Sequence, residues 1–146
     1  MIHITKDILD PDEITDKVRN PSAGAIISFL GSTRNVTSDR KVLYLEYEAY
    51  EPMARKELAA VADEMHERWP LHGVAISHRL GRLEIGEISL VVAVSSQHRP
   101  DAFAACEYSI DRIKQTVPIW KKEYFEGGAV WVESPEDQHT SSTFNA

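Results

Sequence analysis

The sequence contains a single cysteine, Cys106, so it holds no pair from which an internal disulfide or a multi-cysteine metal site could form. It has no apolar run close to the roughly 20 residues that a membrane-spanning helix needs. Its first ten residues, MIHITKDILD, lack a basic start followed by a long apolar segment, so no signal peptide is expected. These absences predict a cytoplasmic protein.

Positive charge is also scarce. The formal net charge of −7 argues against broad binding to nucleic acid or anionic membranes, which requires a basic surface. A local basic pocket for one small anion is still compatible with this charge. The cations are unevenly placed, and several cluster late in the chain: Arg112, Lys114, Lys121 and Lys122, with His98 and Arg99 just upstream.

The length of 146 residues, with 42% hydrophobic and 27% charged residues, is typical of one soluble globular domain. We expect a single domain over residues 1–134 and a polar tail over residues 135–146, which has little reason to be ordered by itself. Helical and strand-like patterns are mixed without strict alternation, which favours the α+β class.

Apolar periodicity predicts the individual elements. Strands are expected at residues 24–31, 42–50, 73–80, 88–95 and 129–133. The segment 73–80 alternates like a half-buried strand, whereas 88–95 is continuously apolar and therefore central. Residues 32–41 are polar and unpatterned, which predicts a mobile loop. Helices are expected after Asp10-Pro11, from Pro52 to about Trp69, and from Pro100 with the apolar stripe Phe103, Cys106, Ile110, Ile113 and Val117.

The segment IKQTVPIWKKE, residues 113–123, places lysines around an apolar centre that includes Pro118. A lysine held beside apolar surface and a second cation has a lowered pKa, which makes it usable as a nucleophile or an acid–base group. Lysines that pack their stems and keep their ammonium groups in water are the alternative. We favour that alternative for Lys122, while for Lys114 and Lys121 both interpretations stay open.

Two further segments contain features of anion sites. In SSQHRPDAF, residues 95–103, a strand ends and a helix begins at His98 and Arg99, where free N–H groups, an imidazole and a guanidinium could hold an anion. On this stretch alone, solvated loop residues are slightly favoured. Gly31 followed by Arg34 after a buried strand is common in phosphate sites, but it is weak by itself.

Other chemistry finds less support. The six histidines have no metal-ligand spacing, and His78 on a strand is interpreted as structural, so no metal site is predicted. Cys106 falls on the apolar stripe and is interpreted as a core thiol.

Five motifs occur in one order: FLGSTR (29–34), LEYEAYEPMA (45–54), HRLGRLEIGE (78–87), SSQHRPDAF (95–103) and IKQTVPIWKKE (113–123). Together they resemble the large, catalytic subunit of molybdopterin synthase, over roughly residues 24–134. Each motif alone is modest, but five in order with compatible spacing are a strong signal.

The resemblance implies an α/β-hammerhead type of α+β fold. It also implies a homodimeric core flanked by two copies of a small ubiquitin-like subunit, whose C-terminal Gly-Gly carries a thiocarboxylate. The implied reaction is a sulfurtransferase reaction that installs two sulfurs on cyclic pyranopterin monophosphate and gives the dithiolene of molybdopterin. No metal or redox cofactor is implied, because the sulfur arrives already activated.

The resemblance also assigns roles to single residues. Lys114 and Lys121 match the catalytic lysines, and His98 and Arg99 match anion-binding residues that reach the pocket of the other protomer. Arg34 matches a further anion-binding residue. A third set is expected along the channel that receives the partner's tail: Phe29, Ile110, which stands where the family often has methionine, and Pro118.

Two other functions compete with this interpretation. The first is a non-catalytic module that binds the Gly-Gly tail of a ubiquitin-like protein, suggested by the apolar plug between the lysines. The second is a protein that binds a phosphate ester or nucleotide at the helix start beside His98 and Arg99.

Overall fold

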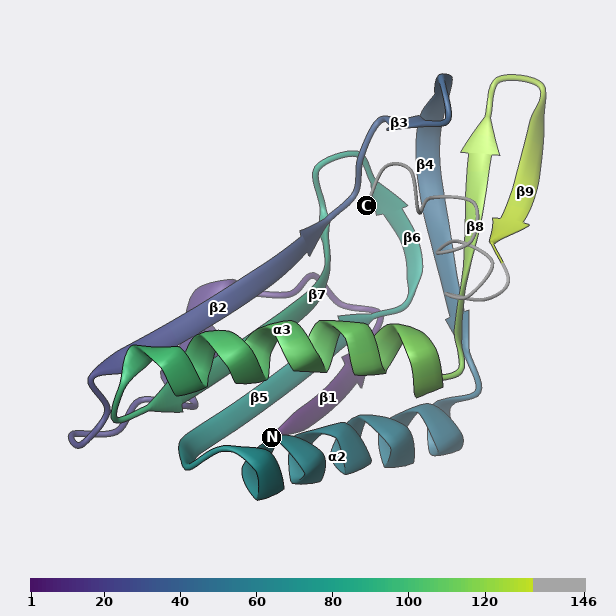
Figure 1. Cartoon of the computed structure of the whole chain (residues 1–146). Helices are drawn as coiled ribbons and strands as arrows, with labels where there is room; N and C mark the ends of the chain where they lie inside the picture. Colours follow the sequence, from purple (N-terminus) through teal and green to yellow (C-terminus); the bar gives the residue numbers. More distant parts are fainter. Residues whose placement is uncertain (133–146) are drawn as a thin grey trace.

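The computed structural model describes residues 1–132, which form two sheets and three helices (Figure 1). The first sheet has the order β1-β5-β7-β2, with β1 (Ile2–Thr5), β5 (Leu71–Arg79), β7 (Ile88–Ser96) and β2 (Ala25–Ser32). The second sheet has the order β3-β4-β8-β9, with β3 (Val36–Thr37), β4 (Arg40–Ala49), β8 (Ile119–Phe125) and β9 (Gly128–Val132), while β6 (Gly81–Glu84) also pairs with β4. The helices are α1 (Pro11–Asp16), α2 (Glu51–Arg68) and α3 (Arg99–Thr116). The predicted α+β class is confirmed.

Helices α2 and α3 lie side by side on one face of the first sheet (Figure 1). Between them and the sheet lies the main core, which includes Leu58, Met65, Ile76 and Val92. The short helix α1 covers the opposite face and closes a smaller core cluster of Leu9, Ile14, Val18, Ala75, Val91 and Ala93. The first sheet is therefore covered on both faces, and the second sheet extends away from it.

The prediction that residues 73–80 form a half-buried strand is wrong. In β5, all residues from Val74 to His78 are buried. The alternation in the sequence is real, but both faces of this strand meet helices, and the side toward α1 is lined by small residues such as Ala75. The central position predicted for residues 88–95 is confirmed, because β7 pairs with both β5 and β2.

The predicted apolar stripe of the last helix is partly wrong. Phe103 is 57% exposed, whereas Cys106 and Ile113 of the stripe are buried, and the rest of the buried face of α3 consists of the small residues Ala102, Ala105 and Ser109. Small side chains allow the helix to lie close to the sheet, so its packing face is the one with the least bulk. A stripe chosen for large apolar side chains misses such a face.

The second sheet contains elements that sequence patterns did not indicate. Within the predicted loop 32–41, β3 pairs with the start of β4 through Ser38 and Asp39, which have φ angles of 48° and 67°. Positive φ at both central residues is typical of tight two-residue hairpins. Residues 119–125, expected only to follow the helix, form β8, and its pairing with β4 sets Lys121 opposite Tyr47.

The predicted tail, residues 135–146, lies outside the described residues, as does Glu133 at the end of the last predicted strand. Within residues 1–132, no helix is long and apolar enough to cross a membrane.

Gly24 supports a close approach between the start of β2 and the connection from β7 to α3. Its N–H donates to the carbonyls of Ser96 and Gln97 at 3.0 and 3.2 Å, and a Cβ here would clash with the Gln97 carbonyl oxygen. We expect Gly24→Ala to lower the stability by about 1–3 kcal/mol, as overpacking typically does. Thermal unfolding measures this, with Gly128→Ala as the control because a Cβ there meets nothing within 4 Å. Equal melting temperatures for the two variants would contradict the expectation.

Candidate active site

Lys121 occupies a sheltered position on β8. Its side chain is 22% exposed, and burial lowers the pKa of its ammonium group. Glu123 opposes this effect, whereas the nearby charges of Arg34 and Lys114 lower the pKa further. The structure therefore brings Lys121, Lys114 and Arg34 together, from a strand, a helix end and the connection between β2 and β3. Burial and neighbouring cations favour the neutral amine, which is the form that can act as a nucleophile or a base.

Glu123 is a member of the site that sequence reasoning missed. Its side chain is 6% exposed, and its Oε2 lies 3.8 Å from the Lys121 Nζ. The same oxygen accepts a 3.0 Å hydrogen bond from the Thr37 hydroxyl. Residues 121 and 123 share a face of β8 because side chains alternate along a strand. That alternation in the sequence KKE was the signal that could have found Glu123.

A buried aromatic pair lies beside these groups. Tyr47 is the register partner of Lys121, and its ring meets the His78 ring edge-on at 5.1 Å between centroids. Burial raises the pKa of Tyr47, and the charge of Glu123 raises it further, while a hydrogen bond with Ser89 acts in the opposite direction. Burial lowers the pKa of His78 to about 4, so this imidazole is neutral at physiological pH. His78 is thus a structural residue of β5.

Lys114 lies on the last turn of α3 and is exposed. The helix ends at Thr116, where Val117 adopts an extended backbone and is buried at 6% exposure. Because Pro118 follows at once, the chain leaves the helix and enters β8 within a few residues. This short connection keeps Lys114 close to Lys121. Lys122 lies on the opposite face of β8, with its Nζ 5.2 Å from the ring centroids of both Tyr124 and Trp131.

His98 and Arg99 are not brought to this cluster within one chain. Both are exposed and lie at the start of α3, whereas Lys114 lies on its last turn. An 18-residue helix is about 27 Å long, so the two groups occupy opposite ends of a rigid element. Their contribution to a site in a second protomer stays a prediction.

The residues expected along the tail channel are only partly buried. Phe29 on β2 and Ile110 on α3 pack against the main core, and Pro118 directly precedes β8. All three are half-buried, so each retains some surface for a ligand. Their role as channel residues stays a prediction.

The described residues hold no group of three or more histidine, cysteine or carboxylate side chains arranged to bind a metal. Burial raises the pKa of the Cys106 thiol to about 11, which keeps it protonated and unreactive. Lys121 can lose a proton more easily than an ordinary lysine, and the cations near it suit an anionic substrate.

The pH dependence of activity tests this cluster. We expect kcat/KM to rise as the pH is raised, because the neutral amine is the reactive form. The apparent pKa of this rise should lie below the ordinary lysine value. Arg34→Ala removes a repelling cation and should move the profile to higher pH. Glu123→Gln removes an attracting anion and should move it to lower pH. Shifts of the same sign in both variants would contradict the geometry.

Comparisons with known proteins show the family of this chain. The family model described as MoaE protein matches residues 4–116, which include Arg34 and Lys114 and end shortly before Lys121. A protein of Halalkalibacterium halodurans named molybdopterin synthase catalytic subunit is 52% identical over 120 residues, which are 82% of this chain and 77% of the relative. A Bacillus subtilis protein of the same name is 50% identical over 129 residues, covering 88% of this chain and 82% of the relative.

Solved structures give the same result. The crystal structure of molybdopterin synthase from Staphylococcus aureus superposes with a TM-score of 0.85 at 45% identity and covers 88% of this chain and 94% of that one. The complex of subunits 1 and 2 of molybdopterin-converting factor from Helicobacter pylori shares the fold, with a TM-score of 0.73 at 21% identity and coverage of 90% and 89%. The fold and these matches thus define a family of enzymes of molybdenum cofactor biosynthesis. This chain belongs to the MoaE family.

Proposed function

We propose that the chain is the catalytic subunit of a molybdopterin synthase. In this function it transfers sulfur to cyclic pyranopterin monophosphate, and the donor is the C-terminal thiocarboxylate of a small ubiquitin-like partner. The observation that carries the proposal is the sheltered Lys121 with the charges of Lys114 and Arg34 near it, in a chain whose relatives are named for this enzyme. A phosphorylated substrate accounts for cations concentrated in an acidic protein.

The roles follow from the chemistry of each side chain. Lys114 acts on the thiocarboxylate carbonyl or on a proton, and Lys121, with its lowered pKa, assists as an acid–base group. Arg34 binds the substrate phosphate, since a guanidinium suits phosphate geometry. Because the thiocarboxylate brings activated sulfur, the transfer itself needs no metal or redox cofactor.

The assembly completes the proposed site. A homodimer at the centre of a heterotetramer would let His98 and Arg99 of one chain reach the phosphate bound by the other, which their distance from Lys114 within one chain requires. The Gly-Gly tail of the small subunit would pass Phe29, Ile110 and Pro118, whose exposed apolar edges admit a chain without side chains. We place this assembly in the cytoplasm.

A reconstituted assay tests the function. The chain is mixed with thiocarboxylated small subunit and the pterin precursor, and the dithiolene product is measured, together with the intact mass for an isopeptide between the partner and a lysine. We expect turnover that falls as sulfate is added, because sulfate competes for the cationic site. Partner binding without turnover would point to a tail-binding module. Thermal stabilisation by nucleotide, and none by the pterin, would point to a phosphate-ester binder.

A further inference from the structure

The backbone on both sides of Arg34 is fixed. Thr33 is buried at 4% exposure, and both its N–H and its hydroxyl donate to the Glu87 carbonyl oxygen at 3.0 Å. The Thr33 carbonyl accepts a 2.9 Å bond from the Gly86 N–H, and the Asn35 carbonyl accepts one of 2.9 Å from Val42 on β4. The exposed Arg34 side chain thus extends from a segment that is tied to the β6–β7 turn on one side and to the second sheet on the other.

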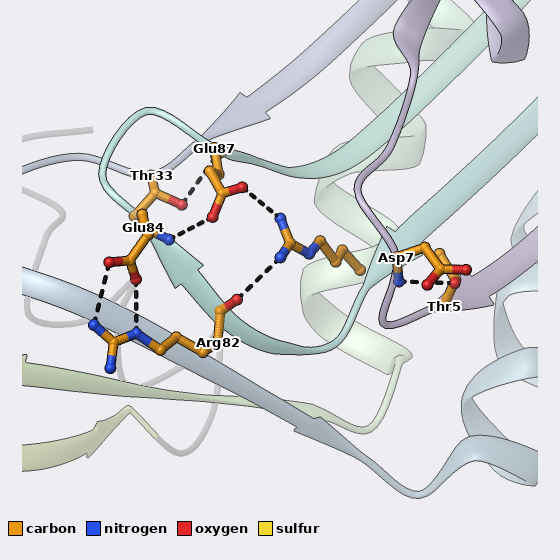
Figure 2. Close-up of polar contacts among 7 residues, drawn as sticks. Thr5, Asp7, Thr33, Arg82, Glu84 and Glu87 are labelled. Carbon is orange, nitrogen blue, oxygen red and sulfur yellow. Dashed lines mark hydrogen bonds and ion pairs between the residues drawn. The ribbon is translucent and has the colours of Figure 1, made fainter.

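Glu87, the residue that holds Thr33, is itself held by ionic contacts. Its carboxylate accepts a 2.7 Å hydrogen bond from the Glu84 N–H and one of 2.9 Å from a terminal nitrogen of Arg79. These two hydrogen bonds lower the pKa of the Glu87 carboxyl. The other terminal nitrogen of Arg79 donates to the Arg82 carbonyl at 3.2 Å. Figure 2 shows Thr33, Glu84 and Glu87 meeting at this turn. The Arg79 side chain is only 11% exposed, so the ion pair is sheltered from water.

A second ion pair in the same turn provides a comparison. The Arg82 guanidinium binds the Glu84 carboxylate through two nitrogens at 2.7 and 3.1 Å, but the two side chains are 57% and 56% exposed (Figure 2). Neither side chain makes a hydrogen bond to Thr33 or Glu87. Glu84 is hydrogen-bonded to Glu87 through its backbone only, because its N–H donates to the Glu87 carboxylate at 2.7 Å and its carbonyl accepts from the Glu87 N–H at 3.0 Å. Exposed pairs of this kind contribute little to stability. The turn therefore carries one pair that is linked to Thr33 and one that is not.

We propose that Arg79, Glu87 and Thr33 form a bracket that positions Arg34 toward Lys121 and the substrate anion. Arg34 is the only one of these four residues that we place in contact with the substrate, and the three bracket residues are positioning residues. A guanidinium that must meet both a phosphate and a neighbouring amine tolerates little displacement, because misplacement of a charged group by about 1 Å can cost a factor of roughly a hundred in rate. The part of this inference that concerns turnover rests on the proposed function.

The first test removes the Thr33 hydroxyl while keeping its shape. We expect Thr33→Val to raise KM for the pterin phosphate roughly three- to tenfold, the range of one hydrogen bond, with a smaller change in kcat. Thr33→Ser keeps the donor and should restore the wild-type KM. Arg79→Lys keeps the charge but loses the paired contacts to Glu87 and the Arg82 carbonyl, so it should act in the same direction. Glu84→Gln is the matched control and should leave KM unchanged.

A double-mutant cycle separates positioning from general loosening. If the bracket acts through Arg34, Thr33→Val should have no further effect on KM in an Arg34→Ala background. Additive effects would overturn the inference, and so would a Glu84→Gln variant as impaired as Thr33→Val. Melting temperatures of all variants identify any that fail to fold, and Arg79→Lys replaces Thr33→Val in the cycle if Thr33→Val is one of them.

A measurement without substrate distinguishes failure of the bracket from failure of the proposed function. The groups that face Lys121 are Glu123 on its own strand, Arg34, Lys114 on α3 and Tyr47 on β4. Titration of ¹³C-methylated lysines by NMR, with the Lys121 signal assigned from its absence in Lys121→Met, reports the pKa of this amine directly. We expect Thr33→Val to raise that pKa toward the value in Arg34→Ala. An unchanged Lys121 pKa in Thr33→Val would overturn the bracket even where turnover is absent.

Discussion

Replacing Lys114 by alanine is expected to abolish formation of the dithiolene product. The amine lies at the end of α3, beside Lys121 and Arg34, and a residue that attacks a carbonyl or moves a proton has no substitute once its nitrogen is removed. We expect kcat to fall by at least about a thousandfold. The measurement is single-turnover product formation with thiocarboxylated partner in excess. The melting temperature should be close to that of the wild type, because the Lys114 side chain is exposed.

A charge-preserving variant separates chemistry from electrostatics at this position. Arginine keeps a positive charge but remains protonated at all accessible pH values, so it neither attacks a carbonyl nor accepts a proton. Lys114→Arg should therefore be nearly as inactive as Lys114→Ala, while it still binds the partner. Near-normal turnover in Lys114→Ala would remove this residue from the mechanism.

Lys121→Met should have the second-largest effect, a fall in kcat of roughly 10²–10⁴-fold, the range of an acid–base group. Methionine retains the packing of the lysine stem within β8 but removes the nitrogen whose pKa is lowered by burial. It also leaves the buried Glu123 carboxylate without the cation 3.8 Å away, so some loss of stability should accompany the loss of rate. Both losses are measured on the same preparation by single-turnover kinetics and thermal unfolding.

The neighbouring lysine provides the control for this variant. Lys122 lies one residue further along β8 and packs against Tyr124 and Trp131 on the opposite face of the strand. Lys122→Met should keep turnover within a fewfold of wild type. If Lys122→Met loses as much activity as Lys121→Met, the assignment of the two faces of β8 is wrong.

Some features of the site could be read from the order of residues alone. For Lys121 the sequence left two interpretations open, a sheltered amine or a solvated one, and the structure favours the sheltered amine, because burial lowers its pKa. The apolar run of β7 identified the centre of the first sheet, because a strand covered on both faces needs apolar residues throughout. Both features could be predicted because they depend on residues that are close together in the sequence.

Other features depend on contacts between distant segments. The Glu123 carboxylate is held by a hydrogen bond from Thr37, which is 86 residues away and lies in a segment interpreted as a loop. The packing face of α3 was misplaced because Phe103 is bulky, whereas the neighbouring sheet accepts alanines such as Ala102. In both cases the environment of the side chain depends on a distant segment that packs against it. The periodicity of a single segment cannot predict that contact.

Helix α3 carries candidate site residues at both of its ends: His98 and Arg99 lie at its start, and Lys114 lies on its last turn. In the proposed dimer each reaction centre therefore combines one end from each copy. A cell that expresses an Arg99→Ala allele together with a Lys114→Ala allele would form mixed dimers, and in each of these one centre keeps both side chains. Two alleles that are each inactive alone would then complement one another genetically.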